Sequence, residues 1–265
     1  MELIEVTELA SIIVSISFLS VSSIYDLKTR EVEDWMWLAY GPIGLALTIL
    51  RLFLNPSNIV ITLIAIAVGV VISLALGYFG LFGGADAKAM ICLSVTLPVN
   101  PTTIHPILGY VHPFFPVVVV IEAFFCSASL AVWFGLTNLF RYLRSGKRMF
   151  EGLESEPWWR KAVACVLGYP VSLAKLQSQF YLYPIEEMKS SNGVSERSFR
   201  LYVSAETDRD QLVSELSNSL TGIDGKSTIW VTPGIPMLLF ILIALILALV
   251  FGDAIFSTVL RLARR

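Results

Sequence analysis

The sequence has little charge and few cysteines. Only 15% of its 265 residues are charged and 55% are hydrophobic, whereas about 25% of residues are charged in a typical soluble domain. The net charge of −2 provides no broad positive field for phosphate groups, so nucleic acid is not an expected partner. Cys92, Cys126 and Cys165 are dispersed without C-x-x-C spacing, which argues against a cysteine-based zinc or redox site. We expect no metal and no cofactor.

Long apolar stretches account for most of the remaining sequence. The mean hydropathy is +0.73, and about 20 apolar residues are enough to cross a hydrocarbon core about 30 Å thick. Glutamates rather than cations precede the first stretch, so it is expected to remain as a helix and not to be cleaved as a signal peptide. The sequence predicts an all-α polytopic membrane protein with six transmembrane helices. The expected spans are Leu9–Tyr25, Trp35–Leu50, Ile59–Tyr78, Asp86–Leu97, Phe114–Phe140 and Pro236–Leu260.

A segment of different character separates the fifth and sixth spans. Arg141–Thr232 carries 12 of the 19 lysines and arginines, which predicts a small soluble α+β insertion. Within it we expect an amphipathic helix from Trp158 to Leu176, with aromatic rings that lie against the bilayer surface. Short strands are expected at Ser198–Ser204 and Ser227–Val231, and a loose stretch at Ser190–Glu196. The domain organisation is therefore 1–140 for helices one to five, 141–235 for the insertion, and 236–265 for helix six with a basic tail.

The distribution of cations predicts the orientation, because lysine and arginine accumulate in cytoplasmic loops. With the amino terminus outside, 15 cations lie inside, including Lys28, Arg30 and Lys88. Four lie outside. These four are Arg51, Arg261, Arg264 and Arg265. The insertion is then cytoplasmic.

Acidic residues within or beside the spans are candidates for function, because ionisable groups are costly there. These are Asp26, Asp86, Glu122 and Asp253. Asp26 ends the first span and Asp86 begins the fourth, and two spans separate them, so both lie at the same membrane face. Glu122 and Asp253 could tune the pair or bind a cation, but we interpret both as groups that face water at a helix end. His105 and His112 fall in a loop on the opposite face and are assigned no metal.

Two neighbouring carboxylates do not readily ionise together, so one holds a proton while the other acts as a base. This is the chemistry of an aspartic protease, in which the base activates water and the acid polarises the scissile carbonyl. Gly83 and Gly84 precede Asp86 and permit close approach of an extended substrate. The alternative interpretation is that Asp86 is only the N-cap of its helix, and Asp26 only an interfacial charge.

Two motifs resemble a known family. The stretch Tyr25–Asp34 (YDLKTREVED) and the stretch Phe82–Lys88 (FGGADAK) are similar to the paired aspartate motifs of the type IV prepilin peptidases, which are GxGD membrane proteases. The archaeal preflagellin peptidase branch is the most similar. Phe115-Pro116 and the stretch Ile229–Pro236 also resemble that branch.

The resemblance implies a cell-membrane aspartic endopeptidase with Asp26 and Asp86 as its catalytic pair and its active site toward the cytoplasm. Its substrates would be preflagellins (archaellins) or related type IV prepilins, from which it would remove a short charged leader. One departure concerns the second motif glycine, which is Ala85 here and tolerates positive φ less well. No paired cysteines or methyl-donor motif accompany the aspartates, so we expect proteolysis only.

Several assignments remain open from the sequence. Lys28, Arg30 and Lys88 are possible contacts for acidic substrate groups or lipid phosphates, or they are simply positive-inside anchors. An intramembrane protease of the presenilin or signal-peptide-peptidase type uses similar motifs. A small proton-coupled transporter and a non-enzymatic assembly factor are alternatives of different classes.

Overall fold

The computed structural model describes residues 2–109, 112–145, 149–191, 194–201, 208–219, 228–255 and 257–258. The chain divides into two compact units. The first comprises Met1–Ser127 with Pro236–Arg265, and the second comprises Ala128–Ile235. Helix α5 therefore begins in the first unit and ends in the second.

The first unit is a bundle of helices. Its described elements are α1 (Leu3–Thr29), α2 (Trp35–Leu54), the short 3-10 turn η1 (Pro56–Asn58), α3 (Ile59–Tyr78), α4 (Gly84–Thr96), the first part of α5 (Phe115–Ser145) and α9 (Met237–Phe251). In the described part of the chain, four segments are long and apolar enough to cross a membrane, namely α1, α2, Pro56–Tyr78 and Phe115–Arg144. The expected helices four and six are present as α4 and α9, but they have only 13 and 15 residues. The protein is thus an integral membrane protein, and the described part of the chain holds four candidate spans.

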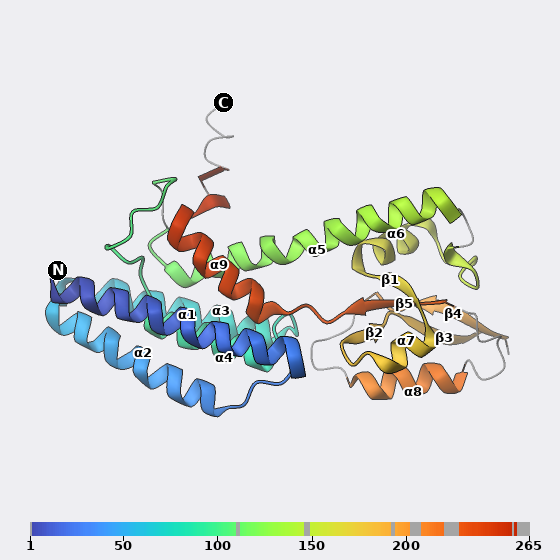
Figure 1. Cartoon of the computed structure of the whole chain (residues 1–265), viewed down its shortest axis with the longest axis horizontal. Helices are drawn as coiled ribbons and strands as arrows, with labels where there is room; N and C mark the ends of the chain where they lie inside the picture. Colours follow the sequence, from blue (N-terminus) through green and yellow to red (C-terminus); the bar gives the residue numbers. More distant parts are fainter. Residues whose placement is uncertain are drawn as a thin grey trace. The chain divides into compact units, whose positions relative to one another are not determined.

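Helix α4 lies at the centre of this bundle and packs against α1, α2, α3 and α9 (Figure 1). Small residues on its neighbours permit close approach, as in many membrane bundles. A Cβ atom added at Gly44 of α2 would lie 1.8 Å from Thr96 Oγ1, and one added at Gly69 of α3 would lie 2.3 Å from Ser94 Oγ. Larger residues at these two glycines would push α2 and α3 away from α4.

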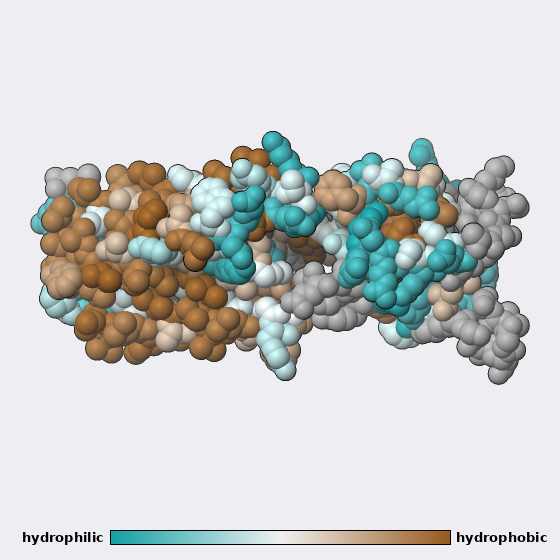
Figure 2. All heavy atoms as spheres, turned by 90° about the horizontal axis from the view of Figure 1, so that it is seen from below, coloured by the Kyte–Doolittle hydropathy of each residue, from teal (hydrophilic) through white to brown (hydrophobic). Residues whose placement is uncertain are grey.

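The outer surface of the first unit is apolar. Figure 2 shows hydrophobic side chains over most of the visible face of this unit and a much more hydrophilic surface on the second. Many large apolar residues of α2 and α3 are exposed, among them Phe53, Val60 and Leu63. This surface suits contact with lipid chains.

Helix α9 ends earlier than the sequence indicated. It stops at Phe251, because Gly252 adopts φ 81° and ψ −149°, a conformation that only glycine reaches without strain. The carbonyls of Val250 and Phe251 accept hydrogen bonds from the backbone N–H groups of Ile107 and Leu108 instead. The expected helix to Leu260 is thus interrupted at Gly252, and Leu260 itself lies outside the described residues.

The second unit combines helices with small sheets (Figure 1). Besides the end of α5, its described elements are α6 (Trp158–Leu167), β1 (Tyr169–Ser172), α7 (Leu173–Ser178), β2 (Leu182–Pro184), β3 (Glu186–Ser191), β4 (Val194–Phe199), α8 (Arg209–Ser219) and β5 (Thr228–Pro233). Antiparallel strands form a sheet of order β1-β5-β2, and β3 pairs with β4 as a hairpin. This confirms a sheet-containing region after the fifth helix.

Aromatic packing holds the core of this unit together. Trp230 of β5 is 1% exposed. Its ring stacks on Phe150 with centroids 5.2 Å apart and meets Phe199 edge-on at 5.9 Å. Because β5 also pairs with both β1 and β2, Trp230 connects the sheet to the hairpin strand β4 that carries Phe199.

Local expectations for this unit were partly wrong. The helix expected from Trp158 to Leu176 is divided into α6 and α7, with β1 between them. The break is at Gly168, where an added Cβ would lie 1.9 Å from the Val231 carbonyl oxygen. The stretch Ser190–Glu196, expected to be loose, lies largely in the β3-β4 hairpin. Of the expected strand Ser198–Ser204, only its start lies in β4, and residues 202–207 lie outside the described part of the chain.

Candidate active site

Asp26 lies in the last turn of α1, where the helix ends with an unusual backbone conformation. Arg30 caps the helix with φ 59° and ψ 15°, and its backbone N–H donates to the Asp26 carbonyl at 3.0 Å. Within the described part of the chain, Arg30 is the one non-glycine residue with positive φ. This turn directs the Arg30 guanidinium back along the helix, with its Nη1 3.8 Å from Asp26 Oδ2. The Asp26 side chain is 16% exposed.

Asp86 occupies the third position of α4. The helix begins at Gly84, and Gly83 is its N-cap in an extended conformation. The Gly83 backbone N–H donates to Asp86 Oδ2 at 3.0 Å. The alternative interpretation of Asp86 as the N-cap is therefore wrong in position, although its carboxylate does accept a hydrogen bond from the backbone at the helix start.

The structure places both aspartates at the same end of the bundle, Asp26 near the end of α1 and Asp86 near the start of α4. Helix α1 packs against α4, and the Asp86 carboxylate lies within electrostatic range of both Asp26 and Arg30. The site thus consists of two carboxylates with one guanidinium beside them. Such a group can hold and exchange a proton.

The glycine motif before Asp86 leaves room beside this pair. A Cβ added at Gly83 would lie 3.2 Å from Asp86 Oδ2, whereas one added at Gly84 would have no atom within 4 Å. Ala85 lies inside α4 and is not among the described residues with positive φ. The replacement of the second motif glycine by alanine therefore causes no backbone strain here.

The other two cations of the motif are placed differently from Arg30. Lys88 Nζ forms an ion pair with Asp34 Oδ1 at 2.6 Å, and both side chains are well exposed. This pair links the start of α4 to the N-cap of α2. Lys28 is exposed in the last turn of α1, where a cation is favoured by the helix dipole.

Glu122 and Asp253, the two other acids that the sequence singled out, lie together elsewhere in the bundle. Both are only 4% exposed, so the prediction that they face water is wrong. Glu122 Oε1 accepts hydrogen bonds from the backbone N–H groups of Ala254 at 3.0 Å and Ile255 at 3.3 Å. It therefore caps the helical turn that follows the break at Gly252. His112 also makes a local contact, since its Nδ1 accepts from the Phe114 N–H at 3.1 Å.

A buried polar cluster was not foreseen from the sequence. Glu8 of α1 is 6% exposed and accepts hydrogen bonds from Thr102 Oγ1 at 3.1 Å and the Thr103 N–H at 3.0 Å. Arg51 of α2 donates to Thr48 Oγ1 at 2.7 Å and to the Thr96 carbonyl, and it interacts electrostatically with Glu8. Glu8, Ser15 and Ser22 are all buried. Their heptad spacing was the sequence signal that could have revealed a buried polar side of α1.

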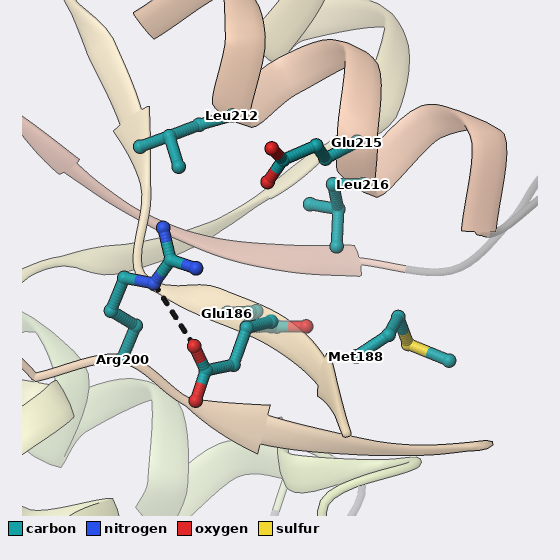
Figure 3. Close-up of a pocket in the computed structure, with 7 residues that line it drawn as sticks. Glu186, Met188, Arg200, Leu212, Glu215 and Leu216 are labelled. Carbon is teal, nitrogen blue, oxygen red and sulfur yellow. Dashed lines mark hydrogen bonds and ion pairs between the residues drawn. The ribbon is translucent and has the colours of Figure 1, made fainter. Parts of the chain in front are cut away.

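The second unit contains a cavity of about 360 Å³ between α8 and the β3-β4 hairpin. Glu215, Leu212 and Leu216 project into it from α8, toward Arg200 (Figure 3). Arg200 Nε donates to Glu187 Oε2 at 3.0 Å. Both partners of this ion pair line the cavity.

Two separate parts of the chain match known protein families. Residues 13–137, which include both aspartates, match the type IV leader peptidase family. Residues 160–254 match the archaeal peptidase A24 C-terminus type II.

Three proteins that are named preflagellin peptidase align over most of their length. The relative from Methanocaldococcus jannaschii is 30% identical over 246 residues, which cover 89% of this chain and 92% of the relative. Those from Methanococcus maripaludis and Methanococcus voltae are 26% and 23% identical, and the alignments cover 93% and 95% of those proteins. The chain therefore belongs to the type IV leader peptidase family.

Proposed function

We propose that this protein is a membrane aspartic endopeptidase that removes the short charged leader from preflagellins or related type IV prepilins. The observation that carries the proposal is the placement of Asp26 and Asp86 at the same end of the bundle, within electrostatic range of each other. Membership of the family and relatives named preflagellin peptidase support the substrate class.

In the proposed mechanism, the two aspartates have different roles. The Arg30 guanidinium, 3.8 Å from Asp26, favours the ionised carboxylate, so we assign Asp26 as the base that takes a proton from the attacking water. Asp86 then holds a proton, polarises the scissile carbonyl and later protonates the leaving amine. Both carboxylates must approach one water to about 3 Å in the reacting complex.

The open space beside Gly84 provides a path for an extended substrate segment. A peptide at this position would place its scissile bond at the boundary of the bilayer, because both aspartates lie at helix ends. This location suits removal of a leader that precedes a hydrophobic helix. Lys28 is placed to contact acidic substrate groups or lipid phosphates.

The proposal includes a topology of six spans, in which α4 and α9 cross the membrane within the bundle formed by the longer helices. About 20 Å of helix in α4 is short for a bilayer core of about 30 Å. Its surroundings of α1, α2, α3 and α9 shield its ends from lipid. In this arrangement, the aspartates and the insertion at 141–235 lie on the cytoplasmic side of the cell membrane.

The test is cleavage of a purified preflagellin with a basic leader by the full-length protein in detergent. Asp26→Asn and Asp86→Asn should each lower the cleavage rate by at least about 100-fold, as expected for loss of a general acid or base. Asp210→Asn is the matched control, since this carboxylate is 87% exposed on α8. Full activity in either active-site variant would remove that aspartate from the mechanism.

A further inference from the structure

The exposed face of helix α6 in the second unit is apolar. Trp158 is 80% exposed, and Trp159, Val163 and Val166 are also exposed on the same side of the helix. The intervening cations turn toward the protein: Arg160 pairs with Glu156 at 3.0 Å and Lys161 donates to the Glu154 carbonyl at 3.2 Å. A helix that faces water would instead expose its charged residues and bury its apolar ones.

A second apolar surface lies on the carboxyl-terminal half of α5, within the same unit. Its exposed residues recur at helical spacing along one stripe. They are Trp133, Leu136, Phe140 and Leu143. Leu143, close to the end of the helix, is still 72% exposed.

Helices α5 and α6 pack against each other. A Cβ added at Gly135 of α5 would lie 3.8 Å from Val166 Cγ2 of α6. Asn138 of α5 donates to the Cys165 carbonyl at 2.8 Å, and Phe134 contacts Tyr169 with ring centroids 5.6 Å apart. Helix α6 therefore packs against the side of α5 that is opposite the exposed stripe. The exposed residues of α6, which we call the α6 face, lie beside α5 where Val166 meets Gly135.

The length of α5 indicates what these apolar surfaces contact. With 31 residues, the helix is about 46 Å long, which exceeds a hydrocarbon core of about 30 Å. Its apolar character nevertheless continues to Arg144. Tryptophans together with cations such as Arg141 and Arg144 are typical of the membrane interface, where rings and long charged side chains bridge apolar and polar layers.

We propose that the α6 face lies in the interfacial layer of the bilayer, so that the second unit is held against the lipid surface and does not extend freely into the cytoplasm. Helix α5 leaves the membrane core with its apolar stripe toward lipid. On the other side of α5, helix α6 lies in the plane of the interface with Trp158 and Trp159 toward the acyl chains. The inference is independent of the peptidase activity, since it rests on the exposed side chains of this unit.

The test uses the full-length protein in nanodiscs that hold one copy each. In a background with Cys92, Cys126 and Cys165 replaced by alanine, a spin label is attached at Val163→Cys on α6 or Leu143→Cys on α5. Two reference sites bracket the result: Leu63→Cys on the lipid-facing surface of α3, and Ser214→Cys on the exposed side of α8. Power saturation then measures the collision of each label with oxygen, which concentrates in lipid, and with a water-soluble nickel chelate.

We expect the oxygen-to-nickel ratio at positions 163 and 143 to approach the ratio at position 63 and to exceed that at position 214 several-fold. A ratio equal to that at position 214 would place the face in water and overturn the proposal. Low collision rates with both reagents would also overturn it, because they would show that protein, such as a second copy in a misassembled disc or another segment of this chain, covers the face.

Discussion

At the scale of single residues, the proposed active site includes a left-handed helix end that sequence patterns did not reveal. Asp26 and Asp86 were identifiable because two spans between them place both at one face. The role of Arg30 was not, since Lys28 and Lys88 carry the same charge in the same motifs. The left-handed turn at Arg30 decides which cation meets the carboxylate, and such a turn is set by the packing of the helix end.

Arg30→Gln is expected to impair cleavage most at acidic pH. The guanidinium favours the ionised form of the neighbouring Asp26. Without it, the carboxylate that acts as the base becomes protonated already at a higher pH. The acid limb of the pH profile of kcat/KM should therefore shift upward by about one unit. Arg30→Lys, which keeps the charge, should shift the limb less. An unchanged profile in the glutamine variant would show that Arg30 does not act on the base.

Ala85→Gly is expected to leave the cleavage rate unchanged while lowering the melting temperature. Ala85 lies inside α4, and glycine in a helix costs about 0.5–1 kcal/mol relative to alanine. Restoring the family glycine therefore gives no catalytic benefit in this backbone. A rise of several-fold in kcat would contradict this and show that the motif changes conformation when substrate binds.

At the scale of elements, sequence patterns located the helices better than their ends. Apolar length was enough to predict α2 and α3, because their composition changes sharply at Arg51 and Asn55 and again near Tyr78. The breaks at Gly168 and Gly252 depended on distant partners, namely the backbone of β5 for the first and residues 107–108 for the second. Such contacts are invisible to local periodicity.

The turn after α9 provides a test of such contacts between residues that are distant in the sequence. Glu122→Ala removes the acceptor for the N–H groups of Ala254 and Ile255 and should destabilise the protein by about 1–3 kcal/mol, the cost of unpaired buried donors. Glu122→Gln keeps an acceptor oxygen and should cost less. Thermal unfolding in detergent measures both, and equal melting temperatures for the two variants would contradict a capping role.

At the scale of the whole molecule, the stability of the second unit depends on pH through a buried carboxylate. In the second unit, burial opposes ionisation of Glu156, but hydrogen bonds from Ser198, Arg160 and the Phe199 N–H outweigh it and lower the pKa of Glu156. A carboxyl with a lowered pKa stabilises the fold above its ordinary value of 4.5, and this contribution is lost as the pH falls through the folded-state value.

Glu156→Gln should therefore make the melting temperature of the protein less dependent on pH below about pH 5. The variant is expected to be less stable than the wild type at neutral pH and to approach it in acid. Tryptophan fluorescence follows the transition, because Trp230 lies in the core of this unit. A pH dependence as steep as that of the wild type would assign the acid sensitivity to other carboxylates.

The proposed topology makes the final prediction, because the placement of both aspartates on one side requires α2 and α3 to cross the bilayer. In a cysteine-free background, Ser57→Cys between α2 and α3 should react with a membrane-impermeant maleimide in intact cells. Glu33→Cys, beside the aspartates, and Ser214→Cys, in the second unit, should react only after lysis. The distribution of cations predicts this orientation, because 15 lie on one side and four on the other, and cations accumulate in cytoplasmic loops. Labelling of positions 33 and 57 from the same side would show that α2 does not cross the bilayer. It would thereby contradict the inference that Asp26 and Asp86 lie on the same side of the membrane.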